Sequence, residues 1–228
     1  MAWLWILLKH YTKFEVWICF DAVLVGGNDN LRPYVRSITI FNNTYLNVGV
    51  TARELCHYFF VPEVRMEWET TVEEVTVLEK IAPDTLIFLQ LHKRVWPAAQ
   101  RDALFWSHMR HLGTDSSLDN KNHLETDSWM VCNKSAKHPD APENQGGCLR
   151  VGLTVCFVCD TFIDKGYTKE TATRNNISTK ITYCSVVNPG GWAPASVLRT
   201  VFKREYPRFL KRFTQYVIDK SKDKALYW

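Results

Sequence analysis

The chain has 228 residues, of which 46% are hydrophobic and 13% aromatic, and its formal net charge is +4. This length allows one domain with a sizeable core, and no stretch reaches the roughly 20 apolar residues that a membrane-spanning helix needs. The positive charge is concentrated at the end, because residues 193–228 contain nine Lys and Arg against three Asp and Glu. Phe and Leu are mixed with these basic residues, which favours lipid headgroups over nucleic acid as the anionic partner. No nucleic-acid-binding motif is present, so nucleic acid is not an expected partner.

Two apolar stretches, residues 2–8 and 14–25, lie near the beginning of the chain. Lys9, His10 and Lys13 separate them. No basic segment precedes the first stretch, which makes it a poor signal peptide. Each stretch is expected to form a buried helix or strand, with an interfacial membrane anchor as the less favoured alternative.

Runs rich in Val, Ile, Thr and aromatic residues, separated by turn signals, predict β-strands. The runs are residues 34–41, 44–50, 70–81, 84–92, 101–109, 128–136, 149–160 and 179–187, with an Asn-Asn turn between the first two. A helix is predicted over 51–60, where Thr51 and Glu54 fit a capping box. Polar loops are expected at 113–127 and 137–147. This order predicts an α+β fold in which a curved antiparallel sheet is closed by a C-terminal helix.

The seven cysteines are irregularly spaced, which fits reduced thiols in a cytosolic protein better than a disulfide framework. Cys156 and Cys159 form a lone CxxC in a strand-like run, where residues three apart face opposite sides. The pair is therefore badly placed to share a metal ion or to form a disulfide. No metal or cofactor is expected.

Strand alternation places several polar residues on apolar faces. Gln90, for example, alternates with Leu86 and Phe88 in the run 84–92. Asn133 and Tyr183 lie on the apolar faces of their own runs in the same way, and Glu69 directly follows Trp68 at the expected start of another strand. An unpaired buried polar group costs on the order of 1–3 kcal/mol. These groups therefore either pair within the protein or converge on a cavity that takes a ligand with an amide and hydroxyls.

Residues 180–216 are expected to form a strand, a tight loop and a long helix. Gly190 and Gly191 permit a sharp reversal, Trp192 adds a large aromatic side chain to the loop, and Pro194 suits a first helical turn. The helix has an apolar stripe, which consists of Leu198, Val201, Phe202, Phe209, Leu210, Phe213 and Val217. Its opposite face is basic and carries Lys203, Arg204, Arg208, Lys211 and Arg212. Such a helix suits a lid over an apolar cavity at a membrane surface, although ordinary packing on a sheet would also explain it.

Catalytic patterns are scarce: the chain has no GxSxG, no HExxH and no glycine-rich phosphate loop. His57, His92, His108 and His111 have no nucleophile partner that the sequence makes evident. The chain is therefore not expected to be an enzyme.

Four blocks of sequence resemble START lipid-transfer domains, in particular those that carry ceramide. They are WETT at 68–71, HKRVWPAAQRD at 92–102, SWMVCNKS at 128–135, and residues 180–217 with NPGGWAPASVLR. The resemblance covers roughly residues 50–228. It leads us to expect a START domain at 31–228 and a divergent segment at 1–30 that is part of the domain or appended to it.

The resemblance implies a helix-grip fold, in which the sheet surrounds a hydrophobic tunnel closed by the C-terminal helix. It implies that the domain extracts ceramide and carries it between membranes without covalent chemistry. The alternatives are another lipid, such as a sterol, diacylglycerol or phospholipid, and a role as a sensor. An enzyme on the same fold, such as a thioesterase or cyclase, is a more distant alternative.

Residue roles follow from the same resemblance. Glu69, Gln90 and Asn133 would bond to the ceramide amide and hydroxyls, with Tyr183 nearby and Arg65 orienting Glu69. The membrane-inserting residues would be Trp96, Trp192 and Pro194. Phe105 stands where the family has Tyr, so one polar contact near the pocket would be lost.

The resemblance also implies a monomer in the cytoplasm that associates transiently with endoplasmic reticulum and Golgi membranes. The phosphoinositide-binding domain and receptor-binding motif that accompany such START domains are not found in this sequence.

Overall fold

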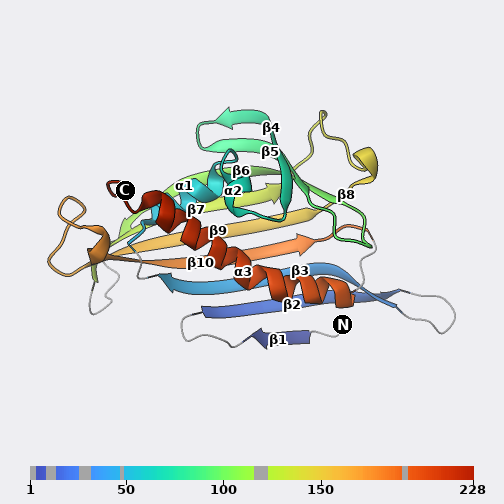
Figure 1. Ribbon diagram of the computed structural model, residues 1–228, viewed down its shortest axis with the longest axis horizontal. Coiled ribbons are helices and arrows are strands. Elements are labelled where there is room, and N and C mark those ends of the chain that lie inside the picture. The colour runs from blue at the N-terminus through green and yellow to red at the C-terminus, as the bar shows by residue number, and fades with distance from the viewer. Residues whose placement is uncertain (1–3, 9–13, 26–31, 47–48, 116–122, 192–194) are drawn as a thin grey trace.

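The computed structural model describes residues 4–8, 14–25, 32–46, 49–115, 123–191 and 195–228 (Figure 1). Within these ranges, one sheet contains ten strands, and three α-helices accompany it. The strands are β1 (Leu4–Leu8), β2 (Phe14–Val25), β3 (Arg32–Leu46), β4 (Val72–Ala82), β5 (Thr85–His92), β6 (Arg101–Asp115), β7 (His123–Ser135), β8 (Leu149–Arg150), β9 (Gly152–Asp164) and β10 (Ile177–Asn188). The helices are α1 (Ala52–Phe60), α2 (Arg65–Trp68) and α3 (Ala195–Ser221).

The strand order is β1-β2-β3-β10-β9-β7-β6-β5-β4, and every pair along it is antiparallel. The short β8 pairs in parallel with β6, off this path. All three α-helices lie on one face of the sheet, and α3 runs across it (Figure 1). The predicted α+β architecture, an antiparallel sheet with a long C-terminal helix, is confirmed.

The predicted turn at Asn42-Asn43 is wrong, because β3 passes through both residues as one strand. Asn42 is paired with Tyr183 and Asn43 with Thr182 on β10. The other edge of β3 is paired with β2. Asn has a low strand propensity, but ladders on both sides of the strand override that local preference.

Two further boundaries differ from the prediction. The polar loop expected at 113–127 is shorter, because β6 extends to Asp115 and β7 begins at His123. Glu69 does not begin a strand: it is the C-cap residue of α2, and β4 begins at Val72. The predicted loop at 113–127 was therefore too long, and the strand after Trp68 was predicted to begin too early.

The capping box predicted for α1 is present. The Thr51 hydroxyl accepts a bond from the Glu54 backbone N–H at 3.1 Å, and the Glu54 carboxylate accepts one from the Thr51 N–H at 2.9 Å. Arg174 then donates two bonds to the same carboxylate, at 3.0 and 2.8 Å. The start of α1 is therefore fixed to the segment between β9 and β10 by a partly buried ion pair.

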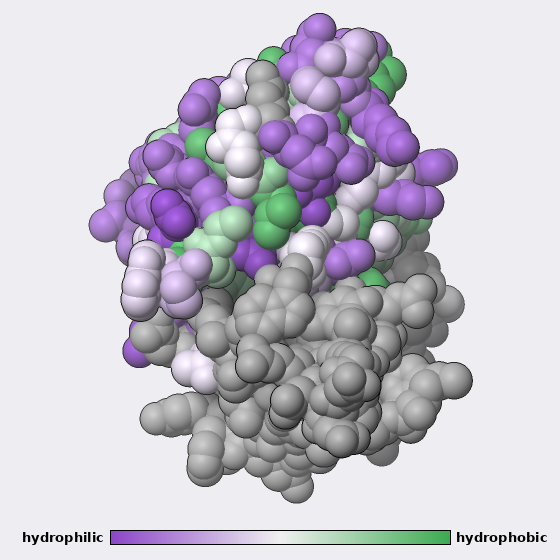
Figure 2. All heavy atoms as spheres, turned by 90° about the vertical axis from the view of Figure 1, so that its right-hand side faces the viewer, coloured by the Kyte–Doolittle hydropathy of each residue, from purple (hydrophilic) through white to green (hydrophobic). Residues whose placement is uncertain are grey.

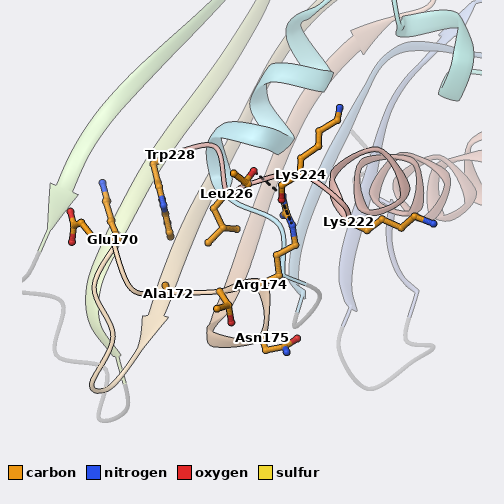
Figure 3. Close-up of a pocket in the computed structure, with 11 residues that line it drawn as sticks. Glu170, Ala172, Arg174, Asn175, Lys222, Lys224, Leu226 and Trp228 are labelled. Atoms are coloured by element: carbon orange, nitrogen blue, oxygen red, sulfur yellow. Dashed lines mark hydrogen bonds between the residues drawn. The ribbon is translucent and has the colours of Figure 1, made fainter.

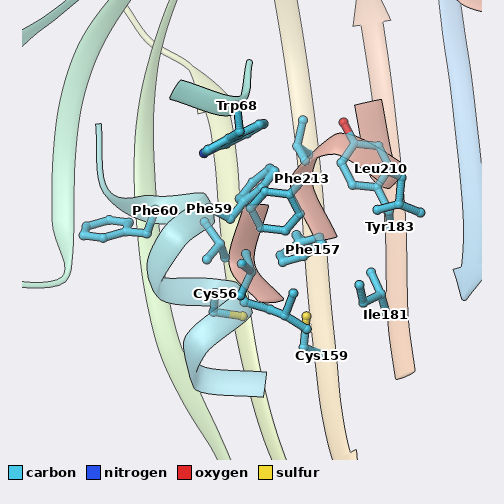
Figure 4. Close-up of a cluster of buried hydrophobic side chains, with 14 of the residues drawn as sticks. Cys56, Phe59, Phe60, Trp68, Phe157, Cys159, Ile181, Tyr183, Leu210 and Phe213 are labelled. Carbon is cyan, nitrogen blue, oxygen red and sulfur yellow. The ribbon is translucent and has the colours of Figure 1, made fainter. Parts of the chain in front are cut away.

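The buried core lies between the helices and the inner face of β5, β6, β7, β9 and β10, and Figure 4 shows part of it. Phe59 of α1 stacks on Phe157 of β9 with ring centroids 4.5 Å apart. Phe213 of α3 meets the ring of Trp68 at 4.7 Å. In the described part of the predicted apolar stripe, Leu210, Phe213 and Val217 are buried. Because these rings interlock, the C-terminal half of α3 is held firmly against the sheet.

A second buried carboxylate with several hydrogen-bond partners, in addition to Glu54, lies in the first half of β7. The carboxylate of Asp127 is 1% exposed, and it accepts bonds from Lys169 at 2.7 Å, His111 at 2.9 Å and the Trp129 indole at 3.0 Å. Burial alone would raise the pKa of Asp127, but the bonds from Lys169 and His111 outweigh it and lower that pKa below its ordinary value. Asp127 therefore links β6, β7 and the segment after β9.

We expect Asp127→Asn to lower the free energy of unfolding by about 2–3 kcal/mol at neutral pH, because charged hydrogen bonds are lost from a buried site. The Asp127 pKa is lower in the folded state than the unfolded value of about 3.9. Its stabilisation is therefore complete above the unfolded pKa and disappears as the pH falls through the folded pKa. Denaturant unfolding from pH 3 to pH 7 would measure both effects.

Asp140→Asn is the matched control, because the Asp140 side chain is 77% exposed and lies 3.7 Å from His138. Exposed ion pairs contribute little, so this variant should change stability by less than about 0.5 kcal/mol. Equal effects of the two substitutions would contradict the role given to Asp127.

Candidate functional site

Polar side chains lie on the inner face of the sheet beside the aromatic core. Gln90 is buried on the same face of β5 as Leu86 and Phe88, as strand alternation predicts. Asn133 is buried on the inner face of β7, two residues beyond the buried Val131. The strand register shows how these positions are related across the sheet.

One row across the sheet runs through Leu86 on β5, Ser107 on β6, Asn133 on β7, Val155 on β9 and Ser185 on β10. All of these residues are buried. The neighbouring row along β9 and β10 contains Phe157 and Tyr183, which are paired with each other and border the aromatic core. The inner face therefore changes from aromatic to partly polar within one row.

Several buried polar atoms in this region find no hydrogen-bond partner within the part of the chain that the structure describes. They are Arg65 Nε, Trp68 Nε1, Gln90 Oε1, Ser107 Oγ and Asn133 Oδ1. Protein interiors seldom leave such groups unpaired, since each costs on the order of 1–3 kcal/mol. This set holds both donors and acceptors, as recognition of an amide and hydroxyls requires.

Arg65, Glu69 and Tyr183 form the charged part of the site. Arg65 is buried and donates to the Phe59 carbonyl at 2.7 Å, with its guanidinium 5.0 Å from the Trp68 ring. Burial lowers the pKa of Arg65 to about 10, against the opposing attraction of Glu69 and Tyr183. Burial likewise raises the pKa of Tyr183 to about 12, so the phenol is neutral at neutral pH.

The Glu69 carboxylate is positioned by a hydrogen bond from a residue two positions further along the chain. Its Oε1 accepts a 2.7 Å bond from the Thr71 hydroxyl. The Glu69 carboxylate also attracts the Arg65 guanidinium, because its charge raises the pKa of Arg65 against the effect of burial. The predicted headgroup residues Arg65, Glu69 and Tyr183 thus lie near one another.

Ser107 and Trp68 are two members of the unpaired set that the sequence analysis did not single out. Ser107 lies on the same strand face as the buried Ala103 and Phe105, so alternation along β6 could have revealed it. Trp68 lies on α2, a helix of four residues that is too short to give a periodic signal. Phe105, where the family was expected to have Tyr, is buried with its ring 4.4 Å from that of Phe88.

The loop 93–100 and the loop that follows β10 lie at the same end of the sheet, on the right in Figure 1. Arg101 connects them, because its Nε donates to the Pro189 carbonyl at 2.9 Å. Gly190 has φ +68°, and a Cβ there would lie 2.4 Å from the Arg150 carbonyl oxygen, so this tight approach requires glycine. Trp192 and Pro194 lie outside the described residues.

Trp96 is 83% exposed at this end, and its neighbour Val95 is 50% exposed. The adjacent Lys93 and Arg94 are also exposed. Figure 2 looks onto this end of the molecule, where hydrophobic and strongly hydrophilic residues lie side by side. Exposed aromatic and basic side chains in one loop are a combination typical of membrane interfaces.

An open pocket of about 640 Å³ lies at the opposite end of the sheet (Figure 3). Lys169, Arg174, Lys224 and Trp228 are among the residues that line it. Arg174 bonds to Glu54 and to backbone carbonyls of the C-terminal tail. The polar contacts of this pocket therefore join the tail to the domain, and the pocket contains none of the predicted headgroup residues.

The fold and the partly polar inner face define the class of protein. The sequence profile of the START domain family matches residues 46–221, and the chain belongs to this family. It is similar to the ceramide transfer protein of Xenopus laevis, with 49% identity over 178 residues, and to the human ceramide transfer protein, with 46% identity over 183 residues. These alignments cover 78% and 80% of this chain and 28% of either relative, so the chain spans little more than a quarter of their length.

Solved structures show the same fold at low identity. Human STARD10 superposes with a TM-score of 0.68 and 17% identity, covering 96% of this chain and 74% of that one. Human StAR-related lipid transfer protein 5 gives a TM-score of 0.58 and 13% identity, covering 96% and 86%. Among the described residues, none of the helices is both long and apolar enough to cross a bilayer.

Proposed function

We propose that this START domain binds one ceramide molecule in its interior and carries it between membranes. The observation on which this rests is that the buried polar atoms Gln90 Oε1, Ser107 Oγ and Asn133 Oδ1 have no hydrogen-bond partner among the residues that the structure describes. The identity of 46–49% with ceramide transfer proteins supports the choice of lipid. No covalent step is involved, so the chain acts as a carrier and not as an enzyme.

The headgroup chemistry matches these atoms. The side-chain carbonyl oxygens of Gln90 and Asn133, which have no partner within the described ranges, can accept from the amide N–H and a hydroxyl of ceramide. Glu69 can accept from a second hydroxyl, while Arg65 and Tyr183 keep its surroundings polar. Each bond relieves the cost of a buried unpaired group, which is on the order of 1–3 kcal/mol. A lipid without an amide leaves some of these groups unsatisfied.

The acyl chains supply affinity but little selectivity. Burial of each CH₂ is worth about 0.8 kcal/mol, so a lipid leaving a bilayer for water faces a high barrier. An apolar interior replaces the bilayer as solvent and removes most of that barrier. Apolar contacts discriminate weakly between chains, and selection therefore depends on the polar groups.

The end of the sheet with the loop 93–100 would face the membrane. Trp96, together with Trp192 and Pro194 in the loop after β10, would enter the interface, and Lys93 and Arg94 would meet anionic headgroups. We further propose that the protein acts as a cytoplasmic monomer at endoplasmic reticulum and Golgi membranes. The START domain would span residues 31–228, with 1–30 as a divergent addition.

Mass spectrometry of the lipid that co-purifies with the chain from eukaryotic cells tests this function. We expect ceramide at close to one molecule per protein, enriched over the diacylglycerol, sterol and phospholipid of the same cells. Enrichment of one of those other lipids would contradict ceramide as the cargo, and protein free of any lipid would contradict the carrier function.

A further inference from the structure

Three cysteines form a row across the outer face of the sheet, opposite to the helices. Cys132 on β7 is paired with Cys156 on β9, and Cys156 is paired with Cys184 on β10. Their neighbours along each strand, such as Asn133 and Phe157, are buried on the inner face. The three thiols therefore point away from the lipid site, and all three are half-buried.

The thiols of Cys132 and Cys156 already touch, with their Sγ atoms 3.9 Å apart. Directly opposed residues of an antiparallel pair have Cα atoms roughly 4.5–5.5 Å apart. A disulfide needs a Cα separation of roughly 4.4–6.8 Å, so this pair falls inside the required range. Rotation of the two side chains can therefore bring the sulfurs to bonding distance without any shift of the strand register.

We propose that Cys132 and Cys156 are a reversible oxidation site, at which a small disulfide such as oxidised glutathione converts the two thiols into a cross-strand disulfide. In the first step one thiolate attacks the small disulfide, forms a mixed disulfide and releases one glutathione thiolate. In the second step the other cysteine thiolate attacks the protein sulfur of the mixed disulfide and releases the second glutathione. Two protein thiols are oxidised and one glutathione disulfide is reduced to two thiols.

The surroundings of Cys132 and Cys156 make thiol–disulfide exchange at this site slow. Burial and the neighbouring Cys156 raise the pKa of Cys132 to about 11, and burial and Cys156 also raise the pKa of Cys184. Thiolate is the reacting form, so little of it is present at neutral pH. On the same face, His108 is paired with Cys132 on β6, Arg110 lies two residues further along β6, and Lys134 lies two residues further along β7.

A second pair of thiols provides an internal comparison. Cys56 on α1 and Cys159 on β9 are both buried in the aromatic core (Figure 4). Burial and contact with Cys56 raise the pKa of Cys159 well above its ordinary value. A small disulfide cannot reach this pair while the protein is folded, so Cys56 and Cys159 should stay reduced.

The test is incubation of the folded chain with oxidised glutathione at pH 8.5, followed by intact mass and peptide mapping without reductant. We expect the loss of two hydrogen atoms, a linked peptide that joins Cys132 to Cys156, and full reversal by dithiothreitol. Cys156→Ser should abolish the link and leave a glutathione adduct on Cys132, and Cys156→Ala should do the same. Cys184→Ser and Cys148→Ser should both keep the link.

Two results would overturn the proposal. One is stable glutathione adducts on Cys132 and Cys156 in the wild-type chain without any internal link. The other is a link that forms at the same rate between Cys56 and Cys159, which would mean that oxidation follows unfolding and not strand register. Circular dichroism of each oxidised sample would verify that the chain remained folded.

Discussion

Asn133→Leu should abolish most ceramide extraction from vesicles while leaving the domain at least as stable as before. Leucine has nearly the shape of asparagine but lacks the buried Oδ1 that finds no partner among the described residues. Removing such a group relieves a desolvation cost, so the free energy of unfolding should be unchanged or rise by up to about 2 kcal/mol. The lost headgroup bond should lower extraction by roughly tenfold to a hundredfold. Gln90→Leu should behave in the same way.

The matched control is Lys134→Gln, since Lys134 is the next residue on β7 and is exposed on the outer face. It should extract ceramide at the wild-type rate. Two measurements are needed together: transfer of fluorescent ceramide between vesicles, and urea unfolding. If Asn133→Leu destabilises the domain by more than about 2 kcal/mol, Asn133 is a structural group and its proposed contact with the headgroup is wrong.

Trp96→Ala should reduce extraction from membranes without reducing the binding of ceramide that is already in solution. The side chain is 83% exposed, so its removal should change the folding stability by less than about 0.5 kcal/mol. Trp is well suited to the membrane interface, where its apolar ring is buried and its N–H stays hydrated. We expect partition onto anionic vesicles to fall at least about tenfold, which corresponds to roughly 1.4 kcal/mol.

Tyr167→Ala is the control for this effect, because Tyr167 is 40% exposed on the segment between β9 and β10, at the other end of the sheet. Its vesicle binding should match that of the wild type. Binding of a short-chain, water-soluble ceramide should be the same for all three proteins. A similar loss by Trp96→Ala in the vesicle and solution assays would indicate that Trp96 supports the fold and does not contact the membrane.

Local sequence signals were sufficient where one short stretch determines its own structure. Thr51 and Glu54 satisfy each other's backbone groups, so the start of α1 could be predicted within one residue. Alternation along β5 placed Gln90 on the buried face for the same reason. Asn42 and Asn43 failed as a turn because their conformation is decided by pairing with β10, far away in the chain.

The site required information that no single strand contains. Gln90 and Asn133 could be recognised as buried polar residues, but their relation depends on the register of β5, β6 and β7. That register also places Ser107 opposite Asn133, which the sequence analysis missed. Trp68 could not be predicted as part of the site, because α2 is a single turn whose position is set by packing of the indole against Phe213. The cysteine row is likewise visible only once three strands are aligned.

The most direct measurement compares the extraction of ceramide with that of an otherwise identical ceramide whose amide nitrogen is methylated. Both lipids carry the same chains, so they differ mainly in the amide N–H. In ceramide this N–H would donate a hydrogen bond to the side-chain carbonyl oxygen of Gln90 or Asn133. We predict that the wild-type chain extracts the methylated lipid at least about tenfold more slowly, and that this preference shrinks in Gln90→Leu and Asn133→Leu. Equal extraction of the two lipids by the wild-type chain would contradict recognition through the buried polar groups.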